Sequence, residues 1–180
     1  GGPGLPIQIA HERGIEFGAD ILVVVNGDNQ MDPSYLSSLL DKVIDDDFDY
    51  AKGNRFFHLK NLKQMPKVRI VGNVFVSFLN KFCTGYWSIS DPLNGYTAIK
   101  VQTYKILDQG KLAKKYDFEV SMFNALSLVD AKVGDVFIPA IYRDEVSHAN
   151  LVKDTFRVMR CLFKGFFRCM FIMRLLFNMC

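Results

Sequence analysis

The stretch that decides the fold is Ala19-Asp20-Ile21-Leu22-Val23-Val24-Val25-Asn26-Gly27-Asp28-Asn29-Gln30-Met31-Asp32-Pro33. Its first half is a continuous apolar run without alternation, which predicts a parallel strand at Asp20–Val25 that is buried on both faces. Its second half is rich in side-chain oxygens at the point where that strand ends. Open α/β sheets bind ligands at the carboxyl ends of their strands, so this corner is a candidate site for a hydroxyl- or phosphate-rich ligand together with a metal ion.

The rest of the chain alternates helices with short apolar strands, which predicts a layered α/β domain with a mostly parallel sheet. Further strands are expected at Tyr50–Lys52, Tyr96–Lys100 and Val133–Ile138. Helices are expected at Leu5–Phe17, from Pro33 to Ile44 with Asp32 as the N-cap, at Val68–Phe82, at Val101–Leu107 and at Phe118–Val129. Two of these helices show an apolar face at helical spacing, formed by Leu36, Leu39, Leu40, Val43 and Ile44 in one and by Val71, Phe75, Phe78, Leu79 and Phe82 in the other.

Composition limits the classes of function. The chain has 180 residues, is 49% hydrophobic and carries a net charge of only +3, which does not indicate a nucleic-acid-binding protein. The four cysteines form no Cys-x-x-Cys pair, which favours reduced thiols in a cytosolic compartment over a disulfide framework. The chain begins without Met at Gly1, and we expect an upstream portion to be absent.

The segment 151–180 differs in kind from residues 1–150, and we treat it as a separate unit. Its basic residues recur every three or four positions, on a stripe about 80° wide around a helix, at Lys153, Arg157, Arg160, Lys164 and Arg168. Most of the remaining side chains from Phe156 onward are apolar. A basic stripe on an apolar helix is typical of an amphipathic helix at a membrane interface. The alternative is a helix packed on the domain whose long cationic side chains reach back to solvent.

Within the corner after Val25, Asp28 is the strongest candidate for chemistry. A divalent cation held by Asp28 could bridge a diphosphate and stabilise it as a leaving group. Gln30 could point the same way, because side chains at i and i+2 of an extended segment share a face. The alternative is a loop of turn-forming residues, and Asp32 fits a helix cap better than a ligand.

Three ordered motifs resemble the family 2 glycosyltransferases, in the bacterial and dolichol-phosphate-mannose-synthase-like branch. They are Asn26-Gly27-Asp28-Asn29-Gln30-Met31-Asp32-Pro33, Gly53-Asn54-Arg55-Phe56 and Asp91-Pro92-Leu93-Asn94-Gly95-Tyr96-Thr97-Ala98. The resemblance covers about residues 1–148. It implies a GT-A fold, a nucleotide-sugar donor, a Mg or Mn ion and an inverting hexosyl transfer. It also implies that this chain lacks the first strand of the family's fold and the acidic residue that reads the nucleotide base.

The resemblance assigns roles to individual residues. Asn26, Asp28, Gln30 and Arg55 match positions that bind the nucleotide sugar, and Asp28 and Gln30 match the metal position. Asn26 stands where the family has the first acid of this motif, which removes one negative charge.

The same resemblance places two catalytic candidates and an acceptor site. Asp91 would orient or deprotonate an acceptor hydroxyl, and its alternative is a turn residue before Pro92. Glu119 would substitute for a second acid that the family carries where Ser121 stands here, or would be a favourable charge in a first helical turn. An acceptor phosphate would contact three further residues, Arg69, Arg143 and Ser147. The alternative for Arg69 is a place on a solvated helix face.

These features predict transfer of a sugar from a nucleotide sugar to a polyprenyl phosphate or a cell-envelope glycan, at the cytoplasmic face of the cell membrane. An acceptor that is already a phosphate anion needs no strong general base. The alternative is a non-catalytic nucleotide-sugar-binding or membrane-scaffold protein on a decayed transferase fold, which the uncharged Asn26 and Ser121 motivate.

Overall fold

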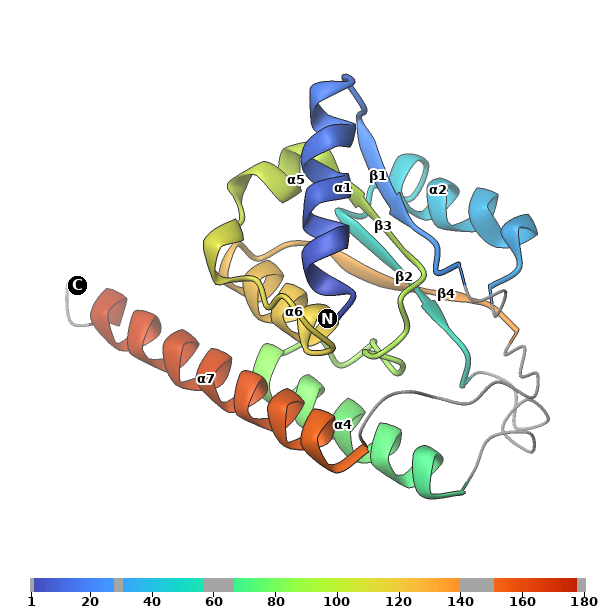
Figure 1. The fold of residues 1–180 in the computed structure, drawn as a ribbon. Helices are drawn as coiled ribbons and strands as arrows, with labels where there is room; N and C mark the ends of the chain where they lie inside the picture. Colours follow the sequence, from blue (N-terminus) through green and yellow to red (C-terminus); the bar gives the residue numbers. More distant parts are fainter. Residues whose placement is uncertain (1, 28–30, 57–66, 140–150, 178–180) are drawn as a thin grey trace.

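The computed structural model describes residues 2–27, 31–56, 67–139 and 151–177. At its centre lies a four-stranded sheet in the order β1-β3-β2-β4, formed by β1 (Ile21–Val24), β2 (Tyr50–Asn54), β3 (Thr97–Lys100) and β4 (Val133–Phe137). β3 runs antiparallel to both β1 and β2, whereas β2 and β4 are parallel. Three strands therefore share one direction and β3 opposes them, which confirms the layered α/β fold with a mostly parallel sheet (Figure 1).

The expectation for the first strand, a parallel strand buried on both faces, is wrong in both respects. β1 lies at an edge of the described sheet, pairs antiparallel with β3 from Ile21↔Lys100 to Val24↔Thr97, and buries only Leu22. An unbroken β-branched run favours a strand but does not specify its neighbours, because antiparallel and parallel strands accept the same side chains. β2 is the strand that is buried along its whole length.

Helices cover both faces of the sheet, and two clusters of apolar side chains fill the layers between them. On one face lie α1 (Gly4–Glu16), α5 (Val101–Ile106) and α6 (Phe118–Leu128), packed over Tyr50 and Ile99. On the other face lies α2 (Leu36–Ile44), packed over Ala51 and Ala98. The change of face between neighbouring residues is the alternation that a pleated strand imposes.

Local signals at the helix ends explain two boundaries. Asp32 Oδ1 accepts a hydrogen bond from Ser34 N at 2.9 Å, which caps the 3₁₀ turn Pro33–Tyr35 before α2, as predicted. This hydrogen bond lowers the pKa of Asp32. α1 ends before Gly18, whose φ of +79° suits a residue without a side chain. In α2, Leu39 and Val43 are buried, but Ile44 is exposed and does not belong to the buried face that was expected.

Two long helices, α4 (Lys67–Thr84) and α7 (Leu151–Phe177), lie side by side against α6 (Figure 1). Their shared core consists of Val76, Cys83, Val120, Val158 and Leu162. Of the helices that the structure describes, none is both long and apolar enough to cross a bilayer.

The orientation of α4 corrects the second helical expectation. The helix buries Asn73, Val76, Ser77, Asn80 and Cys83 toward its neighbours. The side chains expected to face the core are instead exposed by 47–69%, namely Val71, Phe75, Phe78 and Phe82, with only Leu79 partly buried. The spacing correctly predicts an apolar stripe on this helix. It does not reveal whether that stripe packs against the core of the domain or faces outward.

Candidate active site

A cluster of polar side chains lies where β2 and β4 end and where the antiparallel β3 begins. It consists of Lys52, Asn54, Arg55, Asp91, Asn94 and Asp135, and we name it the polar cluster. Strands β2 and β4 are parallel, so their carboxyl ends reach the same edge of the sheet. The segment before β3 arrives at that edge as well, because β3 runs in the opposite direction.

Arg55 and Asp91 form the central contact of the polar cluster. Asp91 is completely buried, and its Oδ2 accepts from Arg55 Nε at 2.7 Å and from the Arg55 backbone N at 3.2 Å. Its Oδ1 accepts from an Arg55 terminal nitrogen at 3.0 Å. The planar guanidinium and carboxylate groups thus meet edge to edge through two parallel hydrogen bonds, the strongest geometry for such a pair. The second and third sequence motifs are joined by this pair.

Asn54 and Asn94 fix the strand ends around that pair. Asn94 Nδ2 donates to Gly53 O at 2.8 Å, and a Cβ at Gly53 would lie 3.0 Å from Asn94 Nδ2 and 2.6 Å from the Ile138 side chain. Asn54 Nδ2 donates to Asp135 Oδ2 at 2.7 Å. A glycine at position 53 is therefore required by close packing of the strand end.

Lys52 is fully buried, which is rare for an ammonium group and needs compensation. Its Nζ donates to Asn94 O at 2.5 Å and lies 5.2 Å from the centre of the Phe123 ring. Burial lowers the pKa of Lys52, and the opposite charges of Glu119, Asp91 and Asp135 counteract that shift. Burial also raises the pKa of Glu119, against the attraction of Lys52. The charge of the predicted catalytic residue Glu119 thus interacts with that of Lys52.

Asp135 belongs to the polar cluster but is not among the site residues predicted from the sequence. The same is true of Lys52, Asn54 and Asn94. Asp135 Oδ2 accepts from Asn54 and from Ser90 N at 3.0 Å, whereas its Oδ1 is buried without a hydrogen-bond partner among the described residues. Burial, helped by repulsion from Asp91, raises the pKa of Asp135 to about 6. A charged residue in the middle of an apolar strand, as at Lys52 and Asp135, is the signal that could have found both.

The raised pKa of Asp135 leads to a stability prediction. Folding disfavours the ionised carboxylate. The contribution of Asp135 to the free energy of unfolding is therefore fully present below the unfolded pKa near 3.8, and it is lost as the pH rises through the folded pKa of about 6. Asp135→Asn keeps the acceptor oxygen and removes the charge. We expect the variant to be more stable than the wild type by about 1–3 kcal/mol at pH 8 and equal to it at pH 4. Urea unfolding at both pH values measures this, and a variant that is less stable at pH 8 would contradict it.

Asn26 brings the first motif to the same edge of the sheet. Its side chain lies against Gly95, where a Cβ would come within 2.7 Å of Asn26 Nδ2. Gly95, within the third sequence motif, therefore lets Asn26 approach the segment that carries Asp91. Described residues of all three motifs therefore lie at this edge, although the motifs are spread over residues 26–98.

Several predicted site residues cannot be placed in this way. Asp28, Gln30, Arg143 and Ser147 lie outside the described residues, and Arg69 lies in the first turn of α4. Among the described residues, no group of three or more His, Cys, Asp and Glu side chains is arranged to hold a metal ion. Both oxygens of Asp91 accept hydrogen bonds from Arg55.

Ser121, which stands where the family resemblance leads one to expect a second acid, has a structural role. Its hydroxyl donates to Phe118 O at 2.7 Å and accepts from Ala113 N at 2.9 Å. Both bonds are local to the start of α6 and tie it to the preceding loop. An acid there could not make the first of these bonds when ionised, because a carboxylate only accepts.

The chain is similar in sequence to known proteins. The chain is 29% identical over 133 residues to a UDP-N-acetylglucosamine–dolichyl-phosphate N-acetylglucosaminyltransferase of Methanococcus voltae. This match covers 74% of this chain and 53% of that protein. It is 23% identical over 124 residues, 69% of this chain and 51% of the relative, to an uncharacterised protein of Methanocaldococcus jannaschii. The chain thus spans about half the length of the curated relatives it matches. No family model matches it.

Solved structures show the same fold. Glucosyl-3-phosphoglycerate synthase from Mycobacterium tuberculosis in complex with phosphoglyceric acid matches with a TM-score of 0.69 at 15% identity, over 92% of this chain and 55% of the synthase. The chain resembles the family 2 glycosyltransferases in sequence and in its GT-A fold. The complex of the synthase with Mn²⁺, UDP and glucosyl-3-phosphoglycerate matches with a TM-score of 0.64 at 15% identity, over 86% of this chain and 52% of the synthase.

Proposed function

We propose that this chain forms part of a glycosyltransferase that moves a sugar from a nucleoside-diphosphate sugar to a polyprenyl phosphate. The observation that carries the proposal is the convergence of the three motifs on one buried, charged edge of a GT-A sheet, around the Arg55–Asp91 pair. The similarity to a dolichyl-phosphate N-acetylglucosaminyltransferase supports the donor class and the lipid-phosphate acceptor.

The donor would bind at the corner after β1. Asp28 and Gln30 would hold a Mg or Mn ion, which when bound neutralises the diphosphate of the leaving nucleotide. The Mn²⁺ and UDP named for the similar synthase support a divalent cation of this kind. Asn26 would contribute a hydrogen-bonding amide where the family carries a charge, so we expect a weaker hold on the cation.

The contacts of Asp91 favour an acceptor that is already an anion. A general base must lie within hydrogen-bond reach of the proton that it removes, and Asp91 is completely buried. Both carboxylate oxygens of Asp91 accept hydrogen bonds from Arg55. Asp91 would therefore orient Arg55 toward the phosphates, and a phosphate acceptor would attack the anomeric carbon without losing a proton. Arg69, Arg143 and Ser147 remain predicted contacts of that acceptor.

The exposed apolar side chains of α4 and α7 support attachment to a membrane surface. We name them the apolar platform; it comprises Val71, Val74, Phe75, Phe78 and Phe82 of α4 with Phe156, Phe163, Phe167 and Met170 of α7. Basic side chains lie along α7 beside it, at Arg157, Arg160, Lys164 and Arg168. Aromatic rings flanked by cations fit the boundary between acyl chains and anionic headgroups. Segment 151–180 would thus hold the site near a lipid acceptor, at the cytoplasmic face.

A transfer assay tests the proposed reaction. The protein is incubated with Mn²⁺, polyprenyl phosphate and labelled UDP-N-acetylglucosamine, and labelled lipid is extracted and counted. We expect product from the wild type, a loss of at least about 100-fold in Asp28→Asn, and a gain in Asn26→Asp because a second carboxylate strengthens cation binding. A scaffold on a decayed fold would yield no product from any of the three proteins, including Asn26→Asp, and that result would overturn the proposal.

A further inference from the structure

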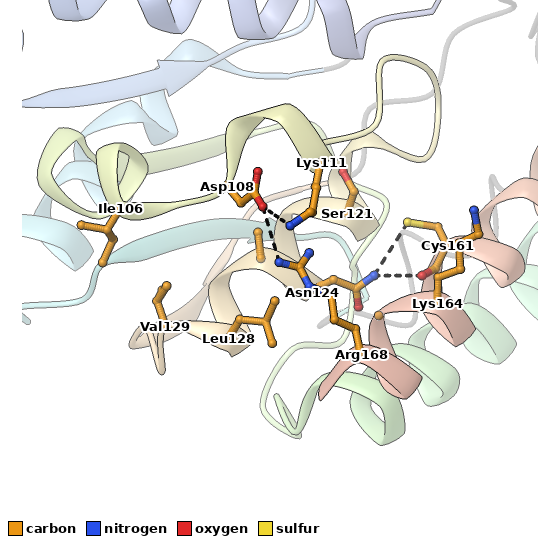
Figure 2. A pocket seen from close by; sticks show the side chains of 12 residues that line it. Ile106, Asp108, Lys111, Ser121, Asn124, Leu128, Val129, Cys161, Lys164 and Arg168 are labelled. Atoms are coloured by element: carbon orange, nitrogen blue, oxygen red, sulfur yellow. Dashed lines mark hydrogen bonds and ion pairs between the residues drawn. The ribbon is translucent and has the colours of Figure 1, made fainter. Parts of the chain in front are cut away.

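We propose that a cavity between α6 and α7 is a second ligand site, which binds the phosphate group of an anionic phospholipid. The cavity has a volume of about 500 Å³ and lies between the end of α5, the 3₁₀ turn Gln109–Lys111, α6 and α7 (Figure 2). None of its lining residues belongs to the polar cluster, and Ser121, which lines it, uses its hydroxyl for bonds at the start of α6.

The charges around the cavity favour an anion. Lys111, Lys164 and Arg168 line it together with one carboxylate, Asp108, which leaves an excess of two positive charges. Asp108 pairs with Lys111 and lies 3.6 Å from Arg168, whereas Lys164 makes no ion pair with the described residues. Burial raises the pKa of the Cys161 thiol to about 11, so this group adds no negative charge at neutral pH.

The walls of the cavity favour a ligand with an apolar part. Its lining contains four apolar residues besides the cationic side chains, namely Ile106, Ala125, Leu128 and Val129. Gly165 allows α7 to approach α6 here, because a Cβ at this position would lie 2.2 Å from the Asn124 side chain. Asn124 donates to Cys161 O at 3.0 Å, while its Oδ1 is buried without a hydrogen-bond partner in the described part of the chain. Apolar walls with a few convergent polar groups are typical of small-molecule sites.

The position of the cavity indicates a lipid as the source of the phosphate. Lys164 and Arg168 line it and also belong to the basic residues beside the apolar platform. On the helical wheel of α7 the basic stripe separates the exposed Phe163 and Phe167 from Cys161 and Gly165, which face the cavity. A bilayer that receives the platform would therefore place its headgroups beside the mouth of the cavity. This step rests on the membrane attachment proposed above.

Monomeric short-chain lipids test the inference without a membrane. Titration calorimetry compares dihexanoyl-phosphatidylglycerol with net-neutral dihexanoyl-phosphatidylcholine and with glycerol 3-phosphate, all below the concentrations at which the lipids form micelles. We expect phosphatidylglycerol to bind at least about tenfold more tightly than the other two, because only it combines net negative charge with acyl chains. Equal binding of glycerol 3-phosphate would overturn the lipid as the ligand, and equal binding of phosphatidylcholine would overturn recognition of charge.

Two variants locate the binding. Lys111→Ala removes a half-exposed cation that does not lie on α7, and Ala125→Leu fills the apolar wall without changing charge. Each should weaken phosphatidylglycerol binding by roughly tenfold, whereas Lys105→Ala, an exposed lysine outside the cavity, should not. Unchanged binding in Lys111→Ala would refute the site. Asp28→Asn should bind this lipid normally, so a failure of the proposed transfer reaction is distinguishable from a failure of this inference.

Discussion

Replacing Arg55 by Ala is expected to lower the free energy of unfolding by about 3–5 kcal/mol and to abolish sugar transfer. The substitution leaves the Asp91 carboxylate buried in the polar cluster without the guanidinium that compensates its charge. An isolated buried charge costs far more than the pair contributes when it is intact. Urea unfolding near neutral pH measures the loss, and the transfer assay measures the activity.

Two controls separate the buried pair from ion pairs in general. Arg13→Ala breaks an exposed pair with Glu16 and should cost less than about 1 kcal/mol. The double variant Arg55→Met with Asp91→Asn removes both charges and should recover most of the stability, but none of the activity. If Arg55→Ala were as stable as Arg13→Ala, Asp91 would not depend on Arg55 and the geometry of the polar cluster would be refuted.

Changing four exposed phenylalanines of the apolar platform to Ser is expected to lower binding to anionic vesicles by at least about 100-fold. Phe75, Phe78, Phe156 and Phe163 are exposed by 45–70%, so their removal should leave the fold stable. A loss of about 0.8 kcal/mol of apolar transfer free energy at each of the four positions adds up to about 3 kcal/mol, which corresponds to a factor of more than about 100 in affinity. Sedimentation with vesicles that contain phosphatidylglycerol measures the bound fraction.

The matched control for this experiment is Phe17→Ser. Phe17 is 88% exposed at the end of α1 and lies outside the platform, so its loss should leave vesicle binding unchanged. High salt should weaken the binding of the wild type, because cations on α7 contribute to it. A quadruple variant that binds vesicles as the wild type does would show that the platform faces another partner.

The sequence predicts the order and type of most elements, because their signals are local. The Asp32-Pro33 cap, the apolar strands and the glycine that ends α1 each act within a few residues. The edge position of β1 and the outward face of α4 are set by contacts between segments far apart in the sequence. Periodicity and composition contain no such information, which is why these two expectations failed.

For the candidate site, the motifs point to Arg55 and Asp91 but not to their contact. Each was interpreted by itself, Arg55 as a phosphate ligand and Asp91 as a base, whereas the structure joins them in one buried pair. Lys52 and Asp135 escaped notice because each stands alone in an apolar strand, and only the register of β2 with β4 pairs Lys52 with Asp135. A charge in the middle of a buried strand is therefore a useful signal even outside a motif.

Calorimetric titration of the folded chain with UDP-N-acetylglucosamine, with and without Mn²⁺, tests most directly whether the corner after β1 holds a diphosphate bridged by a cation. We expect binding that requires Mn²⁺, is at least about tenfold weaker in Asp28→Asn, and is stronger in Asn26→Asp. The absence of any heat of binding for this and other nucleoside-diphosphate sugars, with Mn²⁺ present and the fold intact, would contradict a role in sugar transfer.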